Sequence, residues 1–189
     1  MKTKWLLMAV GIVGTVAVAG AADTKTGGRM RDPADSTFIN EAASGGMMEV
    51  QLGKIAQEKA SSPDVKAFGQ RMVDDHSKAN DRLRALAQEH GVTLKESLPR
   101  EHQKMVDQLS NLSGPAFDRA YMSAMVKDHV EDVAKFRREA KRAEQTPAKE
   151  FAAETLPVLE SHLDLAKSTA AKVGAGSAKS RSHGKHASR

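Results

Sequence analysis

Apolar residues recur every three or four positions in four long stretches of the chain, which is the spacing of one buried helix face. The stretches cover about residues 36–60, 63–90, 115–144 and 147–173. In the second stretch the inward positions follow this spacing without a break: Val65, Phe68, Met72, His76, Ala79, Leu83, Leu86 and His90. The pattern therefore predicts four long amphipathic helices and an all-α fold.

Capping signals mark the beginnings of these helices. Ser62-Pro63 and Thr146-Pro147 each place a hydroxyl residue before a proline, and Gly114-Pro115 opens the third helix. Proline suits the first helical position, where a missing N–H costs nothing. Asp35 or Ser36 is the expected cap of the first helix. Pro157 lies inside the fourth helix, where we expect a kink because proline cannot donate the helical hydrogen bond.

The lengths of the connections predict how the helices are arranged. The first and third connections are short, so helices one and two, and helices three and four, should be antiparallel neighbours. Residues 92–114 form one long connection in the middle, with a short helical stretch after Pro99. One long crossover between the second and third helices is typical of a ferritin-like four-helix bundle.

The two ends of the chain differ from the bundle. Residues 1–22 have two lysines, an apolar run and small residues, as in a cleaved signal peptide. Residues 23–35 read as a flexible lead-in, 36–173 as the bundle and 174–189 as a disordered basic tail. The net charge of +5 resides in the leader and the tail, so the bundle is close to neutral. We therefore expect a periplasmic or secreted protein with no transmembrane span after cleavage and no specific nucleic-acid face.

Several stretches resemble a family of exported bacterial proteins that is catalogued as a domain of unknown function with a ferritin-like bundle. The similarity lies in four segments: Phe38–Ala60, Val65–Leu83, Phe117-Asp118-Arg119-Ala120-Tyr121 and Leu156-Pro157-Val158-Leu159-Glu160-Ser161-His162. It extends over about residues 36–173. The resemblance implies the fold and a location in the cell envelope, and it implies no established activity.

Four polar residues occupy the apolar stripes near the middle of the four helices: Glu49, His76, His129 and His162. In di-iron ferritin-like proteins two helices each supply Glu-x-x-His. Here Val73 and Leu159 stand where those glutamates would be, which disfavours di-iron chemistry. Three imidazoles and one carboxylate instead suit a single ion of Zn, Fe, Mn or Cu. The alternative is a metal-free buried polar layer that fixes the register of the helices.

Further residues near this layer have two interpretations each. Met72 and Met125 each precede a histidine by four positions, so they either add thioether ligands for Cu(I) or fill gaps in the core. Asp75, Asp128 and Asp132 either orient the histidine rings or form solvated helix faces.

These patterns favour a ferritin-like envelope binding protein that is either non-catalytic or weakly linked to a single metal ion, serving by family-level analogy in stress tolerance. No catalytic residues are assigned. One alternative is a metal-free interaction module whose basic tail contacts an anionic envelope polymer. The other is a metalloenzyme that acts on oxidants. The sequence does not determine the oligomeric state.

Overall fold

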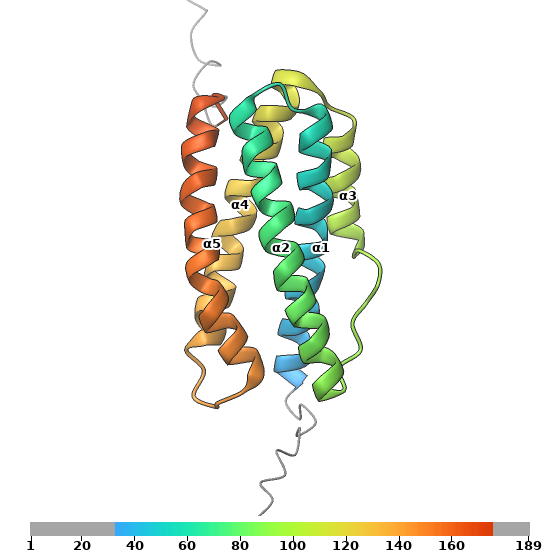
Figure 1. Ribbon diagram of the computed structural model, residues 1–189, viewed down its shortest axis with the longest axis vertical. Coiled ribbons are helices and arrows are strands. Elements are labelled where there is room, and N and C mark those ends of the chain that lie inside the picture. The colour runs from blue at the N-terminus through green and yellow to red at the C-terminus, as the bar shows by residue number, and fades with distance from the viewer. Residues whose placement is uncertain (1–32, 176–189) are drawn as a thin grey trace, which may run out of the picture.

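A computed structural model describes residues 33–175 of the chain, and every regular element in this part is helical (Figure 1). The helices are α1 (Pro33–Lys59), α2 (Pro63–His90), α3 (Arg100–Ser110), α4 (Gly114–Ala140) and α5 (Pro147–Lys172). The all-α prediction is confirmed for these residues. The expected leader, most of the lead-in and nearly all of the basic tail lie outside the described residues.

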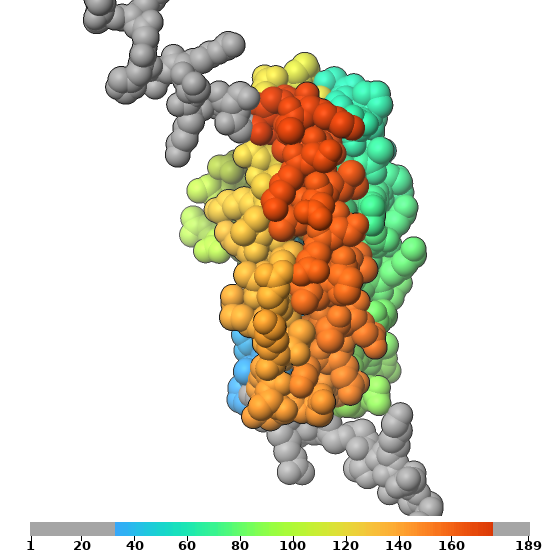
Figure 2. All heavy atoms as spheres, turned by 90° about the vertical axis from the view of Figure 1, so that its left-hand side faces the viewer, coloured from blue at the N-terminus to red at the C-terminus, as the bar shows by residue number. Residues whose placement is uncertain are grey.

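The four long helices lie side by side with their axes roughly along the same line (Figure 1). Helices α1 and α5 run in one direction, and α2 and α4 run in the other. The predicted antiparallel pairs, α1 with α2 and α4 with α5, are thus confirmed. The connection from His90 to Gly114 returns along the length of the bundle and contains α3, which packs mainly on α1. Figure 2 shows α4 and α5 covering one face of the molecule together.

Three of the four long helices, α2, α4 and α5, begin where the predicted signals place them. Thr146 accepts a hydrogen bond from the backbone N–H of Lys149 at 3.2 Å, as an N-cap should. Ser62 precedes Pro63 as expected, although its side chain makes no capping bond. The first helix starts at Pro33, earlier than predicted, so Asp35 lies inside its first turn. There Asp35 is buried and pairs with Arg142 at 2.6 Å instead of capping the helix.

The amide groups before α2 are satisfied from a distant helix. Asp118 of α4 accepts hydrogen bonds from the backbone N–H groups of Ser61 and Ser62 at 3.1 and 2.9 Å, and from the Ser61 hydroxyl. Asp118 is 3% exposed, so a buried carboxylate replaces the missing side-chain cap. This contact fixes the α1–α2 turn against α4.

Close packing of α1 against α2 depends on glycine. A Cβ atom on Gly53 would lie 2.5 Å from the backbone oxygen of Gly69, and one on Gly69 would lie 2.7 Å from the Ala56 Cβ. Gly46 likewise faces the side chain of Asn80 with no room for a methyl group. Close packing therefore requires a glycine at position 46, whereas the neighbouring Gly45 lines a surface cleft.

Two apolar clusters fill the bundle on either side of a central polar layer. One contains Met48, Leu52, Phe68, Met72, Phe117, Tyr121, Met122 and Met125, and the other contains Phe38, Ile39, Leu83, Val133, Phe136, Phe151 and Leu159. The third predicted helix extends too far at residue 144, since α4 already ends at Ala140 and Ala143 is exposed. Pro157 lies within α5 without ending it. None of the described helices is long and apolar enough to cross a membrane.

Candidate metal centre

Glu49, His76, His129 and His162 meet between the two apolar clusters. Each comes from a different long helix. On each helix the residue lies on the inward face near the middle, so the four side chains meet at one level of the bundle. Their exposed fractions are 0% for Glu49 and His129, 1% for His162 and 6% for His76. The sequence pattern thus predicted correctly that all four side chains are buried in the bundle.

The three imidazole rings form a nearly equilateral triangle. Their centroids are 6.0 Å apart for His76 and His129, 5.3 Å for His76 and His162, and 5.5 Å for His129 and His162. One nitrogen from each ring lies within 4.8 Å of the corresponding nitrogens of the other two. Three rings from three helices therefore converge on a small volume.

Two of the three rings are held through one nitrogen by a hydrogen bond, and the third approaches a carboxylate. His129 donates through Nδ1 to the backbone oxygen of Met125 at 3.0 Å, and His162 donates through Nε2 to Asp75 Oδ2 at 2.9 Å. His76 Nδ1 approaches Glu49 Oε2 to 2.9 Å. These contacts fix the ring orientations and the tautomers of His129 and His162, as groups behind metal-bound histidines commonly do.

The other nitrogen of each ring has no hydrogen-bond partner among residues 33–175. These atoms are His76 Nε2, His129 Nε2 and His162 Nδ1. A buried polar atom without a partner costs about 1–3 kcal/mol, and native proteins contain few of them. Three such nitrogens gathered in one layer therefore require an explanation that ordinary core packing does not supply.

Glu49 reaches the layer from the side of His129. Its Oε1 lies 3.4 Å from His129 Nε2, while its Oε2 faces His76. Neither oxygen forms a hydrogen bond within the described part of the chain. Glu49 also belongs to a second group of potential ligands, in which its carboxylate, Asp128 and His129 place donor atoms within 4.8 Å of one another. The structure thus gives two overlapping groups that share His129.

Burial controls the protonation of the layer. It lowers the pKa of both His76 and His162 to about 4, and it lowers the pKa of His129 as well. All three rings are therefore neutral at pH 7, which is the form that binds metal ions. Burial also raises the pKa of Glu49 to about 8, against the opposing effect of His129.

The three aspartates near the histidines take different positions. Asp75 holds His162, as in the interpretation that assigns it an orienting role. Burial works in the opposite direction, yet the hydrogen bond from His162 and the nearby Arg71 lower the pKa of Asp75. For Asp128 and Asp132 the solvated-face interpretation does not hold. Burial raises the pKa of Asp128 to about 9 and also raises that of Asp132.

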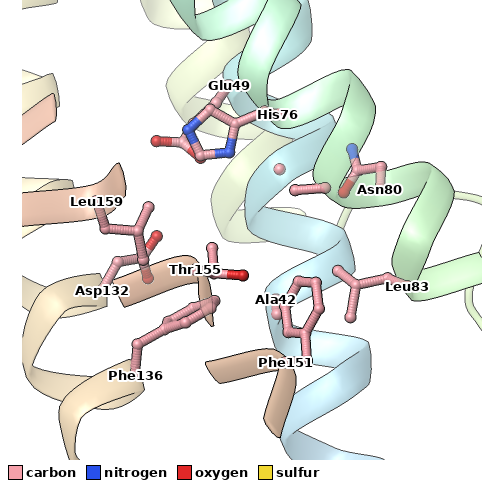
Figure 3. Close-up of a pocket in the computed structure, with 12 residues that line it drawn as sticks. Ala42, Glu49, His76, Asn80, Leu83, Asp132, Phe136, Phe151, Thr155 and Leu159 are labelled. Atoms are coloured by element: carbon pink, nitrogen blue, oxygen red, sulfur yellow. The ribbon is translucent and has the colours of Figure 1, made fainter. Parts of the chain in front are cut away.

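A small polar cavity adjoins the layer (Figure 3). Its volume of about 20 Å³ is the space that one water molecule needs. Glu49 and His76 border it on one side, and Asn80, Asp132 and Thr155 contribute polar atoms around it. Asn80 was not singled out from the sequence, although it follows His76 by one helical turn and is buried. Its side-chain oxygen has no partner in the described residues.

Met72 and Met125 both belong to the apolar cluster that includes Phe68 and Tyr121. Each is fully buried there. This position favours gap filling over thioether ligation.

The comparisons with known proteins agree with this helical arrangement. A family model described as "Domain of unknown function (DUF4142)" matches residues 19–169 of the chain. The chain belongs to the DUF4142 family. The match includes all four residues of the central layer and most of α5. The comparison with curated proteins finds no match.

Two solved structures are similar to this DUF4142 protein. A DUF305 fragment from Deinococcus radiodurans matches with a TM-score of 0.65 and 14% identity, over 75% of this chain and 97% of the fragment. A DUF305 protein from Streptomyces coelicolor, described as a "putative secreted protein", matches with a TM-score of 0.64 and 15% identity, over 75% and 93% of the two chains. At this identity the similarity concerns the fold alone.

Proposed function

We propose that this protein is an exported, ferritin-like four-helix bundle that binds one divalent transition-metal ion in its central layer. His76, His129 and His162 supply three nitrogen ligands, and Glu49 supplies a carboxylate oxygen. The observation that carries the proposal is the convergence of three buried histidine rings, which place one nitrogen each within 4.8 Å of the others and which each have a nitrogen without a hydrogen-bond partner in the described residues.

The spacing of the donor atoms fits such an ion. Bonds of 2.0–2.2 Å in a tetrahedral site place neighbouring ligand atoms about 3.3–3.6 Å apart. Glu49 Oε1 and His129 Nε2 already lie 3.4 Å apart. The three ring nitrogens lie within 4.8 Å of one another, so small side-chain rotations bring them to bonding distance.

The type of donor restricts the metal. Neutral imidazole suits Zn, Cu, Fe and related ions, whereas Ca and Mg require mostly oxygen ligands. A metal-bound carboxylate is ionised, so binding at neutral pH releases the proton that the raised pKa of Glu49 retains in the metal-free protein.

The second candidate is a metal-free polar layer that fixes the helix register, and one observation favours it. With a pKa raised by burial to about 8, Glu49 is protonated at pH 7 and can donate a hydrogen bond to a neutral histidine. A neutral layer of this kind avoids an unpaired buried charge. It offers few hydrogens for the five unpartnered atoms of the layer, since a protonated Glu49 and a neutral His76 supply one each.

Metal analysis of untagged protein tests the proposal. Metal-free protein is dialysed against one metal ion at a time (Zn, Fe, Mn or Cu), and bound metal is measured by mass spectrometry. We expect close to one equivalent for at least one ion, with loss in His162→Gln. His90→Gln is the matched control, because His90 is a buried α2 histidine outside the layer. Wild-type protein that takes up none of these ions would leave the metal-free layer as the function of these residues.

Export remains part of the proposal. It is supported by the composition of residues 1–22, and a DUF305 relative of the same fold is described as secreted. Intact-mass measurement of the native protein tests it. A mass that still includes Met1 through Ala19, on protein recovered from the cytoplasm, would contradict export. A role in envelope stress tolerance stays a prediction.

A further inference from the structure

A surface cleft lies next to the central layer, between α1, α3 and α4. Its volume is about 300 Å³, and its lining includes four acidic residues and two basic ones: Glu41, Asp128, Glu131 and Asp132 with Lys135 and Arg138. His102 of α3 forms part of the wall and bonds to Ser44 of α1 at 2.9 Å. Gly45 also lines the cleft, so no side chain from that position narrows it.

Asp132 separates this cleft from the interior. It lines the outer cleft, and it also lines the small cavity that borders Glu49 and His76 (Figure 3). Asp128 precedes it by one turn on α4, lines the cleft and has one carboxylate oxygen without a partner in the described residues. The acidic side chains of Asp132 and Asp128 thus lie between the surface cleft and Glu49.

The two overlapping ligand groups form the inner end of this arrangement. Glu49, Asp128 and His129 make the outer group, and His76, His129 and His162 make the inner one. His129 has only one nitrogen available, because Nδ1 bonds to the Met125 backbone oxygen. The two groups therefore describe two positions for one ion, and His129 can stay bound while the other ligands exchange.

Two other directions into the layer are obstructed. Apolar clusters fill the bundle on both sides of the layer along its axis. Between α2 and α5, Asp75 bonds to His162, and Arg71 reaches both Asp75 at 3.4 Å and Ser161 at 3.2 Å. A fixed guanidinium at that point repels a cation.

We propose that the metal ion enters the centre through the cleft beneath α3, with Asp132 and Asp128 as relay ligands and Lys135 as the barrier at the entrance. This inference rests on the proposed function of the central layer. Lys135 Nζ lies 3.2 Å from Glu41 and 3.8 Å from Asp132, so its charge occupies the carboxylates that an incoming cation needs. Asp132 and Lys135 are positioning residues here, since neither belongs to the inner ligand group.

The consequence is kinetic. A side chain that helps the ion along the entry route, but does not bind it at its final position, changes the loading rate and the release rate by the same factor. The dissociation constant of the bound ion therefore stays the same. We expect Asp132→Asn to slow both by roughly tenfold, the low end of the rate effects that charged clefts produce. Removal of the Lys135 charge in Lys135→Gln should speed loading.

Stopped-flow mixing of the metal-free full chain with Zn²⁺ measures loading, and competition with a chromophoric chelator measures release. Asp74→Asn is the matched control, because Asp74 is an exposed α2 carboxylate that bonds to Gln70 on the surface. The proposal predicts one bound Zn²⁺ in all four proteins, slow exchange in Asp132→Asn and fast loading in Lys135→Gln.

Several results would overturn the route. The route is wrong if Asp132→Asn loads and releases Zn²⁺ at rates within twofold of the wild-type rates. It is also wrong if Asp132→Asn binds Zn²⁺ with lower affinity while its loading rate is unchanged. If Asp132→Asn fails to fold, unchanged or slower loading of Lys135→Gln overturns it instead. Wild-type protein that binds no metal ion contradicts the proposed function itself, so the two failures are distinguishable.

Discussion

The close contact between α1 and α2 leads to a prediction in which two glycine-to-alanine changes have opposite effects. In Gly53→Ala the new Cβ would lie 2.5 Å from the Gly69 backbone oxygen and 2.9 Å from Val73 Cγ2. Ordinary contacts begin near 3.4 Å, so the helices must separate by about 1 Å. A backbone oxygen cannot rotate away, and overpacking of this kind costs about 1–3 kcal/mol.

Alanine also favours the helix by about 0.5–1 kcal/mol relative to glycine, so the net loss in Gly53→Ala is about 1–2 kcal/mol. For a domain of this size that loss lowers Tm by roughly 3–8 °C. The same separation reaches the centre, because Glu49 precedes Gly53 by one helical turn. The 2.9 Å approach of Glu49 to His76 lengthens, and we expect metal affinity to fall with stability.

Gly45→Ala is the matched control on the same helix. Its Cβ would meet only Asp132 Oδ2, at 3.9 Å, so the propensity gain of about 0.5–1 kcal/mol remains. Urea unfolding of the metal-free proteins gives both free energies, and a thermal melt checks their order. Gly53→Ala at least as stable as wild type, or Gly45→Ala as unstable as Gly53→Ala, would refute the packing argument.

Three further changes test the contacts around the centre. Asp118→Ala should destabilise the protein by about 1.5–3 kcal/mol, because it removes the buried carboxylate that accepts hydrogen bonds from the amides of Ser61 and Ser62; urea unfolding checks this. Asp75→Ala should lower metal affinity about 10–100-fold by releasing the His162 ring, with one ion still bound, as calorimetric titration would show. In metal-free protein, the free energy of unfolding of Glu49→Gln should increase relative to that of wild type as pH rises from about 4.5 to about 8. Folded Glu49 keeps a proton across that window which the unfolded chain releases, so a gain that is constant with pH would contradict its raised pKa.

The fold and the four central residues were predictable because both depend on local periodicity. A helical stripe faces inward whatever its neighbours are, so Glu49, His76, His129 and His162 had to meet once the stripes packed together. Short and long connections then limited the directions of the helices. The cap residues placed two helix beginnings within the chain, since their chemistry involves only adjacent residues.

The surroundings of the centre depend on tertiary contacts, which periodicity does not encode. Asp128 and Asp132 lie beside the inward stripe of α4, where the same sequence spacing fits either a solvated or a covered face. The position of α3 decides between them, because α3 packs on α1 and its His102 forms part of the wall of the cleft beside these aspartates. Asp35 was misassigned for a similar reason: its partner Arg142 is distant in sequence.

Charge and protonation connect the metal-free and the metal-bound states proposed for the layer. Without a metal ion, neutral histidines and a protonated Glu49 keep net charge out of the bundle, yet they leave ring nitrogens without partners. A divalent ion bonds to those nitrogens and converts Glu49 to the carboxylate that partly neutralises it. Asp132 lies outside both groups of potential ligands, so its substitution by a neutral residue changes the rate of exchange and leaves the bound state unchanged. That difference separates the proposed entry route from the proposed binding site.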